Sequence, residues 1–233
     1  SQENGFQQIA DYLEDKNDDT VLLIKGYAGT GKTTLIGHLV KKLNVVNKKS
    51  ILMAPTGRAA KVLSSYSGKH ALTIHKKIYF PKAVSSGSGI QFSLKENKHT
   101  NTVFIIDESS MIGDDRQQSK LFENGSLLHD LIHFVDNGEK CKLIFVGDTA
   151  QLPPVHLNIS PALSEEELET QFNKKVYSIT LEDVVRQQAT SGILYNATSI
   201  RELLVKEDYL GFNFNLEGFN DVHRILEGNE LLE

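Results

Sequence analysis

The sequence predicts an α/β fold in which a parallel β-sheet carries helices on both faces. Short, almost wholly apolar runs recur along the chain, as is typical of strands that are buried on both faces of a parallel sheet. Segments with the spacing of amphipathic helices separate several of these runs, and this alternation is typical of doubly wound sheets. The expected strands are residues 20–25, 50–54, 103–106 and 142–146.

Composition excludes several classes of protein. The chain has 233 residues, of which 39% are hydrophobic and 24% are charged, as in ordinary globular proteins with a large core. Its single cysteine, Cys141, cannot form an internal disulfide, so we expect a reducing environment. No apolar run approaches the roughly eighteen residues that cross a bilayer, and the polar first residues are unlike a signal peptide. We therefore expect a cytoplasmic protein with no membrane partner.

The loop after the first expected strand, residues 26–33, reads Gly-Tyr-Ala-Gly-Thr-Gly-Lys-Thr. Its spacing, G-x-x-x-x-G-K-[ST], is that of a P-loop, in which backbone N–H groups and the dipole of the next helix hold a polyphosphate. A glycine-rich turn without a ligand is the alternative. Within the loop, Lys32 would reach the β- and γ-phosphates and Thr33 would ligate Mg²⁺. The expected nucleotide contacts are Gly26, Ala28, Gly29, Thr30, Gly31, Lys32, Thr33 and Thr34.

An acidic pair follows the third expected strand. Asp107 and Glu108 come directly after four apolar residues, which is the pattern of a Walker B element downstream of a phosphate loop. In such an element the first carboxylate supports Mg²⁺ and the second polarises the attacking water. The pattern therefore predicts hydrolysis of a nucleoside triphosphate such as ATP.

Helical spacing appears in several other segments. Apolar residues at positions 6, 9, 10 and 13 predict a helix at the start of the chain, and residues 34–43 predict a second helix. A short helix should begin at residues 55–58, and residues 119–135 predict a helix interrupted at residues 124 and 125. His129 and His133 are one turn apart in that segment, but we expect no zinc, because neither an H-E-x-x-H arrangement nor a third ligand accompanies them.

Residues 76–100 differ in character from the rest of the chain. Two runs with β propensity, 77–84 and 90–94, flank a turn of glycine and serine. This pattern predicts a small inserted β-hairpin. A disordered loop is the alternative.

Polar residues follow three of the expected strands. In open α/β sheets, ligands bind at the carboxyl ends of the strands. Residues 147–154 after the fourth strand would therefore lie near the acidic pair and near the segment after the second strand. The residues expected to meet at this edge are Thr56, Asp107, Glu108, Asp148 and Gln151.

Charge is divided unevenly along the chain. Residues 20–95 hold thirteen Lys or Arg and no Asp or Glu, whereas the rest of the chain holds twelve basic and thirty acidic residues. An ordinary solvated surface is the alternative for any single lysine. A block of this length indicates a surface that faces polyanions, either nucleotide phosphates or a nucleic-acid backbone.

Six segments together resemble the RecD-like DNA helicases of superfamily 1B, in the order of that family's motifs. The segments are GYAGTGKTT, APTGRAAKVL, TIH at residues 73–75, IIDESSMI, FVGDTAQLPPV and LEDVVRQ at residues 181–187. The resemblance runs from about Gln7 to Gln187. It implies a RecA-like P-loop NTPase fold, ATP and Mg²⁺ as cofactors, and single-stranded DNA as a partner.

The resemblance also implies roles for individual residues. Gln7, or alternatively Gln8, would bind adenine, Gln151 would sense the γ-phosphate, and Arg186 would be an arginine finger. With Lys32, Asp107 and Glu108, these last two would complete the catalytic set. The 76–100 hairpin would be the family's strand-separating pin, unless it is an incidental loop. The implied DNA contacts are Pro55, Thr56, Gly57, Arg58, Thr73 and His75.

The chain departs from the family pattern after residue 204. Nothing matches the motifs of the family's second RecA-like domain, so we expect residues 1–204 to form the first RecA-like domain and residues 205–233 to be a linker or the start of the missing one. The expected function is the ATP-hydrolysing motor of a helicase that translocates on single-stranded DNA and unwinds duplexes, incomplete in this chain. Two alternatives are a P-loop ATPase that does not act on DNA and a nucleotide-binding module that does not hydrolyse.

Overall fold

The computed structural model describes residues 2–83, 90–114, 125–181, 191–206 and 211–222. The chain divides into two compact units, Ser1–Asp183 and Val184–Glu233, which are described separately here. The division precedes the domain boundary predicted at residues 204 and 205, and that boundary stays a prediction.

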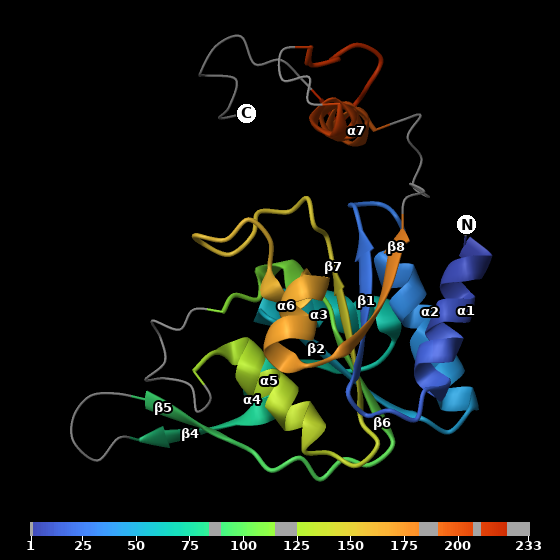
Figure 1. The fold of residues 1–233 in the computed structure, drawn as a ribbon. Coiled ribbons are helices and arrows are strands. Elements are labelled where there is room, and N and C mark those ends of the chain that lie inside the picture. The colour runs from blue at the N-terminus through green and yellow to red at the C-terminus, as the bar shows by residue number, and fades with distance from the viewer. Residues whose placement is uncertain (1, 84–89, 115–124, 182–190, 207–210, 223–233) are drawn as a thin grey trace. The chain divides into compact units, whose positions relative to one another are not determined.

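The first unit is built on a six-stranded sheet in which all neighbouring strands are parallel, in the order β3-β2-β6-β7-β1-β8 (Figure 1). The four strands expected from apolar runs are confirmed as β1, β2, β6 and β7. The two edge strands, β3 and β8, lack a continuous apolar run and were not predicted. The strands are β1 (Thr20–Gly26), β2 (Lys49–Ala54), β3 (Ala71–Thr73), β6 (Thr102–Ile106), β7 (Lys142–Gly147) and β8 (Lys175–Leu181).

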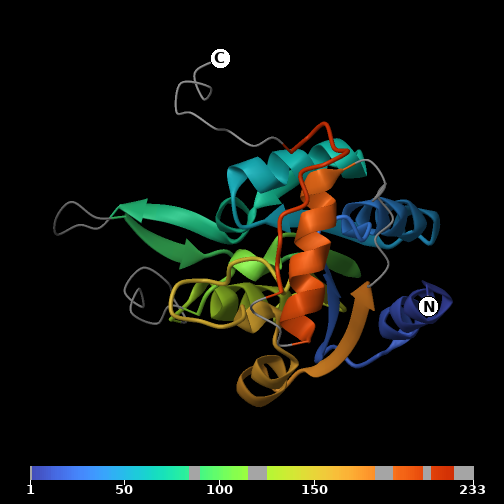
Figure 2. The same cartoon turned by 90° about the horizontal axis from the view of Figure 1, so that it is seen from above.

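Alternate residues of each strand point to opposite faces of the sheet. Both faces are apolar, and helices cover both of them. Leu22 and Ile24 of β1 share a core with α1 (Gln2–Glu14), α2 (Lys32–Val45) and α3 (Gly57–Ser67). Val21 and Leu23 share the other core with α4 (Ile74–Ile78), α5 (Leu127–Asp136) and α6 (Glu165–Phe172). From above, the blue α1 and α2 lie on one side of the sheet and the yellow-green α5 on the other (Figure 2).

The predicted insertion is a two-stranded antiparallel hairpin of β4 (Tyr79–Ala83) and β5 (Ile90–Leu94) that extends from the body of the first unit (Figure 1). Its tip, residues 84–89, lies outside the described residues. The base is anchored, since the buried hydroxyl of Tyr79 donates a hydrogen bond of 2.6 Å to Oδ2 of Asp130 on α5. The hairpin is therefore attached to the same helix layer as α5.

Two predicted helices differ in detail from the structure. In α1, Phe6 is 58% exposed, while Tyr12 is fully buried and donates a 2.6 Å hydrogen bond to the carbonyl of Leu143. A search for apolar residues leaves tyrosine out because its side chain ends in a hydroxyl group. In α1 this hydroxyl has its hydrogen-bond partner inside the core. Of the helix predicted over residues 119–135, α5 is described, with Ser126 as its N-cap, and residues 115–124 lie outside the described residues.

The second unit contains α7 (Gly192–Val205) and the segment 211–222. The two are joined by Asp221, whose carboxylate accepts hydrogen bonds from the backbone N–H of Gly192 and the hydroxyl of Ser191, each at 2.7 Å. Asp221 thereby satisfies N–H groups at the start of α7. Among the helices described in both units, none has the length and apolar character needed to span a bilayer.

Candidate active site

The phosphate loop connects β1 to α2. Gly29 and Gly31 have φ angles of 85° and 88°, a left-handed conformation that other residues rarely adopt. Gly31 is also the N-cap of α2, where no side chain caps the helix and the first turn contains no acidic residue. Such a helix start favours an anion.

Gly26 is required at the start of the loop for a different reason. A Cβ atom there would lie 2.6 Å from Oγ1 of Thr30 and 3.0 Å from Cβ of Leu181. The Thr30 hydroxyl is itself held by a 2.8 Å hydrogen bond to the carbonyl of Tyr27. A side chain at position 26 would therefore push the loop away from the end of β8.

Lys32 lies over the loop that precedes it. Its ammonium group donates hydrogen bonds to the carbonyls of Gly26, at 2.6 Å, and Tyr27, at 2.9 Å. It is also 3.9 Å from Oδ2 of the buried Asp148, directly after β7. A lysine in this position can bind phosphate oxygens as a compact cation.

The acidic pair follows β6, and the backbone N–H of Asp107 still donates to the carbonyl of Met53 on β2 at 2.9 Å. Glu108 then turns the chain with a φ of 55° and donates its N–H to Oδ1 of Asp107 at 3.0 Å. Burial raises the pKa of Asp107 to about 6, and the charge of Glu108 adds to this; the Glu108 N–H and the Lys32 ammonium oppose it. The charge of Lys32 thus reaches Asp107 across the site.

The residues present fit a magnesium ion. Hydroxyl and carboxylate oxygens are the donors that Mg²⁺ prefers, usually with substrate phosphates completing its coordination. Asp107 and Glu108 are two adjacent, partly buried carboxylates, and a cation beside them would offset the burial of charge and the repulsion by Glu108 that together raise the pKa of Asp107. No group of three or more His, Cys, Asp or Glu in the described part of the chain could hold a metal by itself.

Gln151 connects two of the loops at this edge. Its Oε1 accepts a 2.8 Å hydrogen bond from the hydroxyl of Ser110, two residues after Glu108. Asp148, three residues before Gln151, is the group that approaches Lys32. Since β7 lies between β1 and β6 in the sheet, the loop after β7 contacts both the phosphate loop and the acidic segment.

The DNA-contact candidates lie after neighbouring strands. Ala54 of β2 pairs with Thr73 of β3, so the segments that follow begin side by side. Thr56 caps α3 by accepting from the N–H of Ala59, and Thr73 caps α4 by accepting from the N–H of Lys76, both at 3.2 Å. Two helix N-termini therefore lie next to each other at the carboxyl edge of the sheet.

The other candidates on these segments differ in exposure. Pro55 is partly buried, whereas Gly57 and Arg58 are exposed. His75 is partly buried, with its ring 5.7 Å from that of Tyr79 and 5.6 Å from that of Phe92 at the base of the hairpin. Burial lowers the pKa of His75, so its ring is neutral at neutral pH.

Two further predicted site residues are Gln7 and Arg186. Gln7 is exposed on α1 and donates a 2.8 Å hydrogen bond to Asp11 of the same helix. This bond stays within α1 and does not link Gln7 to the phosphate loop. The helix nevertheless begins on the side of the sheet where β1 ends (Figure 1). The predicted arginine finger, Arg186, lies outside the described residues.

Sequence reasoning missed two members of the site. Ser110 positions Gln151, and its place within the IIDESSMI segment was the only available signal. Leu181, at the end of β8, is the neighbour that excludes a side chain at Gly26. No local pattern joins residues 155 positions apart, so only the pairing of β8 with β1 brings them together.

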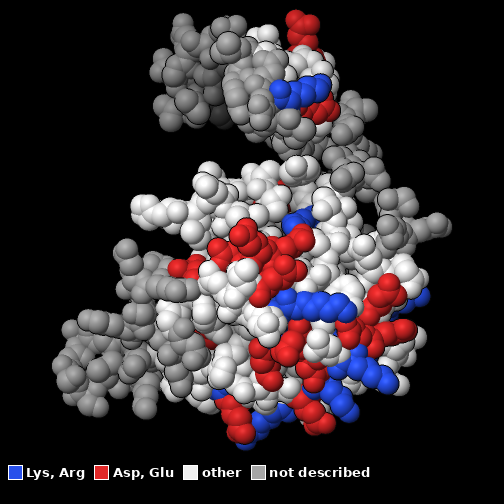
Figure 3. All heavy atoms as spheres, in the orientation of Figure 1, with Lys and Arg blue, Asp and Glu red and all other residues white. Residues whose placement is uncertain are grey.

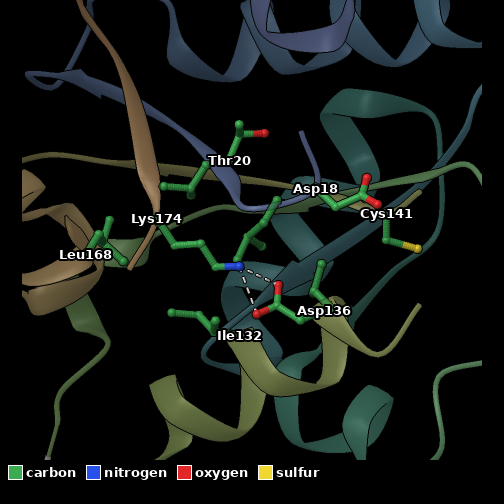
Figure 4. A pocket seen from close by; sticks show the side chains of 10 residues that line it. Asp18, Thr20, Ile132, Asp136, Cys141, Leu168 and Lys174 are labelled. Atoms are coloured by element: carbon green, nitrogen blue, oxygen red, sulfur yellow. Dashed lines mark hydrogen bonds and ion pairs between the residues drawn. The ribbon is translucent and has the colours of Figure 1, made fainter. Parts of the chain in front are cut away.

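A second charged cluster lies away from the phosphate loop (Figure 4). The Lys174 ammonium is 2.8 Å from both carboxylate oxygens of Asp136 and 3.2 Å from Oδ1 of Asp19. Ile132 and Leu168 line the same cavity, which has no room for a water molecule. The cluster therefore closes the core at the amino ends of the strands and offers no ligand site.

Comparison with known proteins connects this geometry to a family. Residues 9–157 match the AAA domain family. The chain is 31% identical over 208 residues to the ATP-dependent DNA helicase dda of Enterobacteria phage T4, covering 86% of this chain and 42% of the relative. It is 28% identical over 192 residues to the ATP-dependent RecD2 DNA helicase of Deinococcus radiodurans, covering 82% of this chain and 23% of the relative. The chain thus spans less than half the length of either relative.

Solved structures share the fold. The Pif1 helicase from Bacteroides, crystallised with ADP-AlF3 and ssDNA, superposes with a TM-score of 0.50 at 22% identity, covering 88% of this chain and 47% of that one. The Pif1 helicase from Candida albicans superposes with a TM-score of 0.52 at 23% identity, covering 86% and 43%. The P-loop helicase fold expected from the sequence, with a parallel sheet and a small hairpin, is confirmed.

Proposed function

The chain belongs to the AAA domain family and is related to the RecD-like DNA helicases of superfamily 1B, and we propose that it is the ATP-binding and ATP-hydrolysing motor domain of a DNA helicase. In this role it couples ATP hydrolysis to movement on single-stranded DNA and to unwinding of duplexes, as a cytoplasmic protein. The observation that carries the proposal is the position of Lys32, whose ammonium is 3.9 Å from Asp148 and whose charge acts on the pKa of Asp107, which supports one site made from three loops.

The residues of the loop bind and orient the triphosphate. Backbone N–H groups at the start of α2 hold the phosphates, and Lys32 exchanges its bonds to Gly26 and Tyr27 for phosphate oxygens. Thr33 and Asp107 would hold Mg²⁺, which neutralises developing charge on the phosphates when bound. Glu108 orients and polarises the attacking water, and Gln151 senses the γ-phosphate from its anchor on Ser110.

Single-stranded DNA binds along the neighbouring loops. The paired starts of α3 and α4 present backbone N–H groups, which bind phosphates without reading sequence. Pro55, Thr56, Gly57 and Arg58 contribute at one start, and Thr73 and His75 at the other. This assignment agrees with the absence of acidic residues between positions 20 and 95.

A second RecA-like domain is the proposed partner that completes the motor. Motors of this kind change state by closing two domains around the nucleotide. Arg186 then stabilises the charge of the transition state, as arginine fingers do. Gln7 binds adenine in the same proposal.

ATP turnover in the presence and absence of a single-stranded oligonucleotide tests the proposal. We expect turnover that rises with DNA and falls by roughly 10²–10³-fold in Lys32→Ala, because a preorganised charge at the transition state is lost. Lys41→Ala, an exposed lysine of the same helix, is the matched control and should keep native turnover. Turnover indifferent to DNA would instead indicate an ATPase that acts on another acceptor.

The alternative of a nucleotide-binding module without hydrolysis makes a separate prediction. In that case Glu108→Gln would leave turnover at the background level of the native chain. If the chain hydrolyses ATP, Glu108→Gln should lose most of the turnover and still bind nucleotide. Binding is measured with a fluorescent ATP analogue on the same samples.

A further inference from the structure

A second pocket lies at the opposite edge of the sheet from the phosphate loop. It has a volume of about 470 Å³, and Lys49, Ser50 and Thr102, at the amino ends of β2 and β6, lie in its wall. Since the six residues of β2 extend over about 20 Å, the pocket is separate from the candidate active site. The wall also includes Asn44, Lys69 and His99.

The pocket wall is rich in positive charge and hydrogen-bond donors. The ammonium of Lys69 donates a 2.8 Å hydrogen bond to the hydroxyl of Ser50. Lys77, which does not line the pocket, donates a hydrogen bond of 2.7 Å from its ammonium to Nε2 of His99. Lys48 also lines the pocket, although its ammonium is bonded to the carbonyl of Leu13 at 2.7 Å.

No carboxylate lines this pocket among the described residues. Glu139 adjoins it through its backbone, which bonds to that of Asn101 and His99, but its side chain is not part of the wall. Acidic side chains gather elsewhere, over α6, on the face drawn in Figure 3. Because α6 packs against β8, it is at the far end of the sheet from β2.

Burial is the main cause of the lowered pKa values at this pocket and beside it. Burial lowers the pKa of His99, and the charges of Lys77 and Lys49 lower it further. Burial likewise lowers the pKa of Lys69. Burial lowers the pKa of Lys77, and the charge of Lys95 lowers it further. An anion in the pocket would relieve all of these costs.

We infer that this pocket is a second anion site, which binds phosphoryl groups through Lys49, Lys69 and His99 in its wall. The ligand is either a free polyphosphate or the phosphate backbone of a nucleic acid, since both present the same oxygens. The site is independent of the proposed ATPase activity. It also accounts for basic residues of the acid-free block that the active site does not use.

His99 provides a local reporter of binding. The imidazole resonances of His99, assigned by their loss in His99→Gln, are followed by NMR from pH 5 to pH 8. The protein carries Lys32→Ala to weaken the phosphate loop, and pyrophosphate or a short oligothymidylate is added at constant ionic strength. We expect the pKa of His99 to rise by on the order of one pH unit, because a bound anion stabilises the imidazolium.

The two probes identify the source of the phosphoryl groups. A response to both indicates a site for phosphate in general, and a response to the oligonucleotide alone indicates a nucleic-acid backbone. A pKa of His99 that neither probe raises beyond the effect of sodium chloride would overturn the inference. ATP turnover is not measured, so this result is distinguishable from a failure of the proposed function.

Paired variants separate the pocket from general surface charge. Lys49→Gln with Lys69→Gln should abolish the rise and weaken pyrophosphate binding about tenfold or more, because two cationic donors are lost. Lys16→Gln with Lys41→Gln removes the same charge from exposed positions outside the pocket and should retain the rise. Lys49→Gln alone, at an exposed residue, replaces the double variant if the latter unfolds. The inference is contradicted if both pairs of variants lose the rise in the pKa of His99 to the same extent, or if neither pair loses it.

Discussion

Asp107, the proposed magnesium ligand, lowers the stability of the fold that carries it. The sequence predicts a carboxylate at this position, but its raised pKa depends on burial and on the charge of Glu108 beside it. A carboxyl group with a pKa of about 6 is ionised at neutral pH, and keeping that charge in the folded protein lowers the stability of the fold. A site poised for a cation carries this kind of cost until the cation binds.

This cost predicts a pH-dependent gain in stability for Asp107→Asn. The folded chain binds the proton more tightly than the unfolded chain, with the pKa raised from 3.8 to about 6. The native protein therefore loses stability as pH rises from about 4 through about 6, and the amide variant does not. We expect Asp107→Asn to be more stable by about 1–3 kcal/mol at pH 7, with the difference vanishing below about pH 4.

Urea unfolding at several pH values measures this difference. Glu169→Gln removes an exposed carboxylate of α6 and should change stability by no more than about 0.5 kcal/mol. Asp107→Asn should also lose ATP turnover. If the variant were no more stable than the native chain at pH 7, the raised pKa would be wrong.

At the scale of elements, β8 and the phosphate loop depend on each other. Gly26 pairs with Leu181 across the parallel β1–β8 contact, and a methyl group at position 26 has no space there. The glycine that the phosphate-loop pattern requires therefore has a packing role as well. That role is visible only once the edge strand is in place.

We expect Gly26→Ala to destabilise the protein by about 1–3 kcal/mol, because Thr30 or β8 must shift. It should also weaken ATP binding, since the loop moves with them. Gly57→Ala is the matched control: Gly57 begins α3, and a Cβ atom there meets nothing within 4 Å. Chemical denaturation should show Gly57→Ala within about 1 kcal/mol of the native protein. Similar losses in both variants would contradict the packing argument.

At the scale of the whole molecule, strand order assembles the site. The sheet inserts β7 between β1 and β6, which brings Asp148 and Gln151 between the phosphate loop and the acidic pair. The same order places α3 and α4 side by side beyond β2 and β3. One sheet edge thus holds both the proposed nucleotide site and the segments proposed to contact DNA.

In the proposed function a second RecA-like domain completes the motor, because such motors close two domains around the nucleotide. We therefore predict that this 233-residue chain binds ATP and single-stranded DNA weakly and does not unwind duplexes. A strand-displacement assay measures this, with the helicase dda of phage T4 as the positive control. Robust unwinding by this chain alone would refute the need for a second RecA-like domain.

The sequence by itself determined the central strands, the phosphate loop and the acidic pair, because these are encoded by contiguous residues. Buried strands need unbroken apolar runs, and a phosphate loop needs glycines and Lys32 at one spacing. The hairpin could be predicted for the same reason, since its two strands and their turn are neighbours in the chain.

Only the tertiary structure decided which of these parts meet. The edge strands β3 and β8, the contact of Leu181 with Gly26 and the bond from Ser110 to Gln151 join residues far apart in the sequence. The cationic pocket around His99 arises in the same way, from the amino ends of β2 and β6. Such contacts leave no local pattern, because they depend on strand order and on the space left between packed elements.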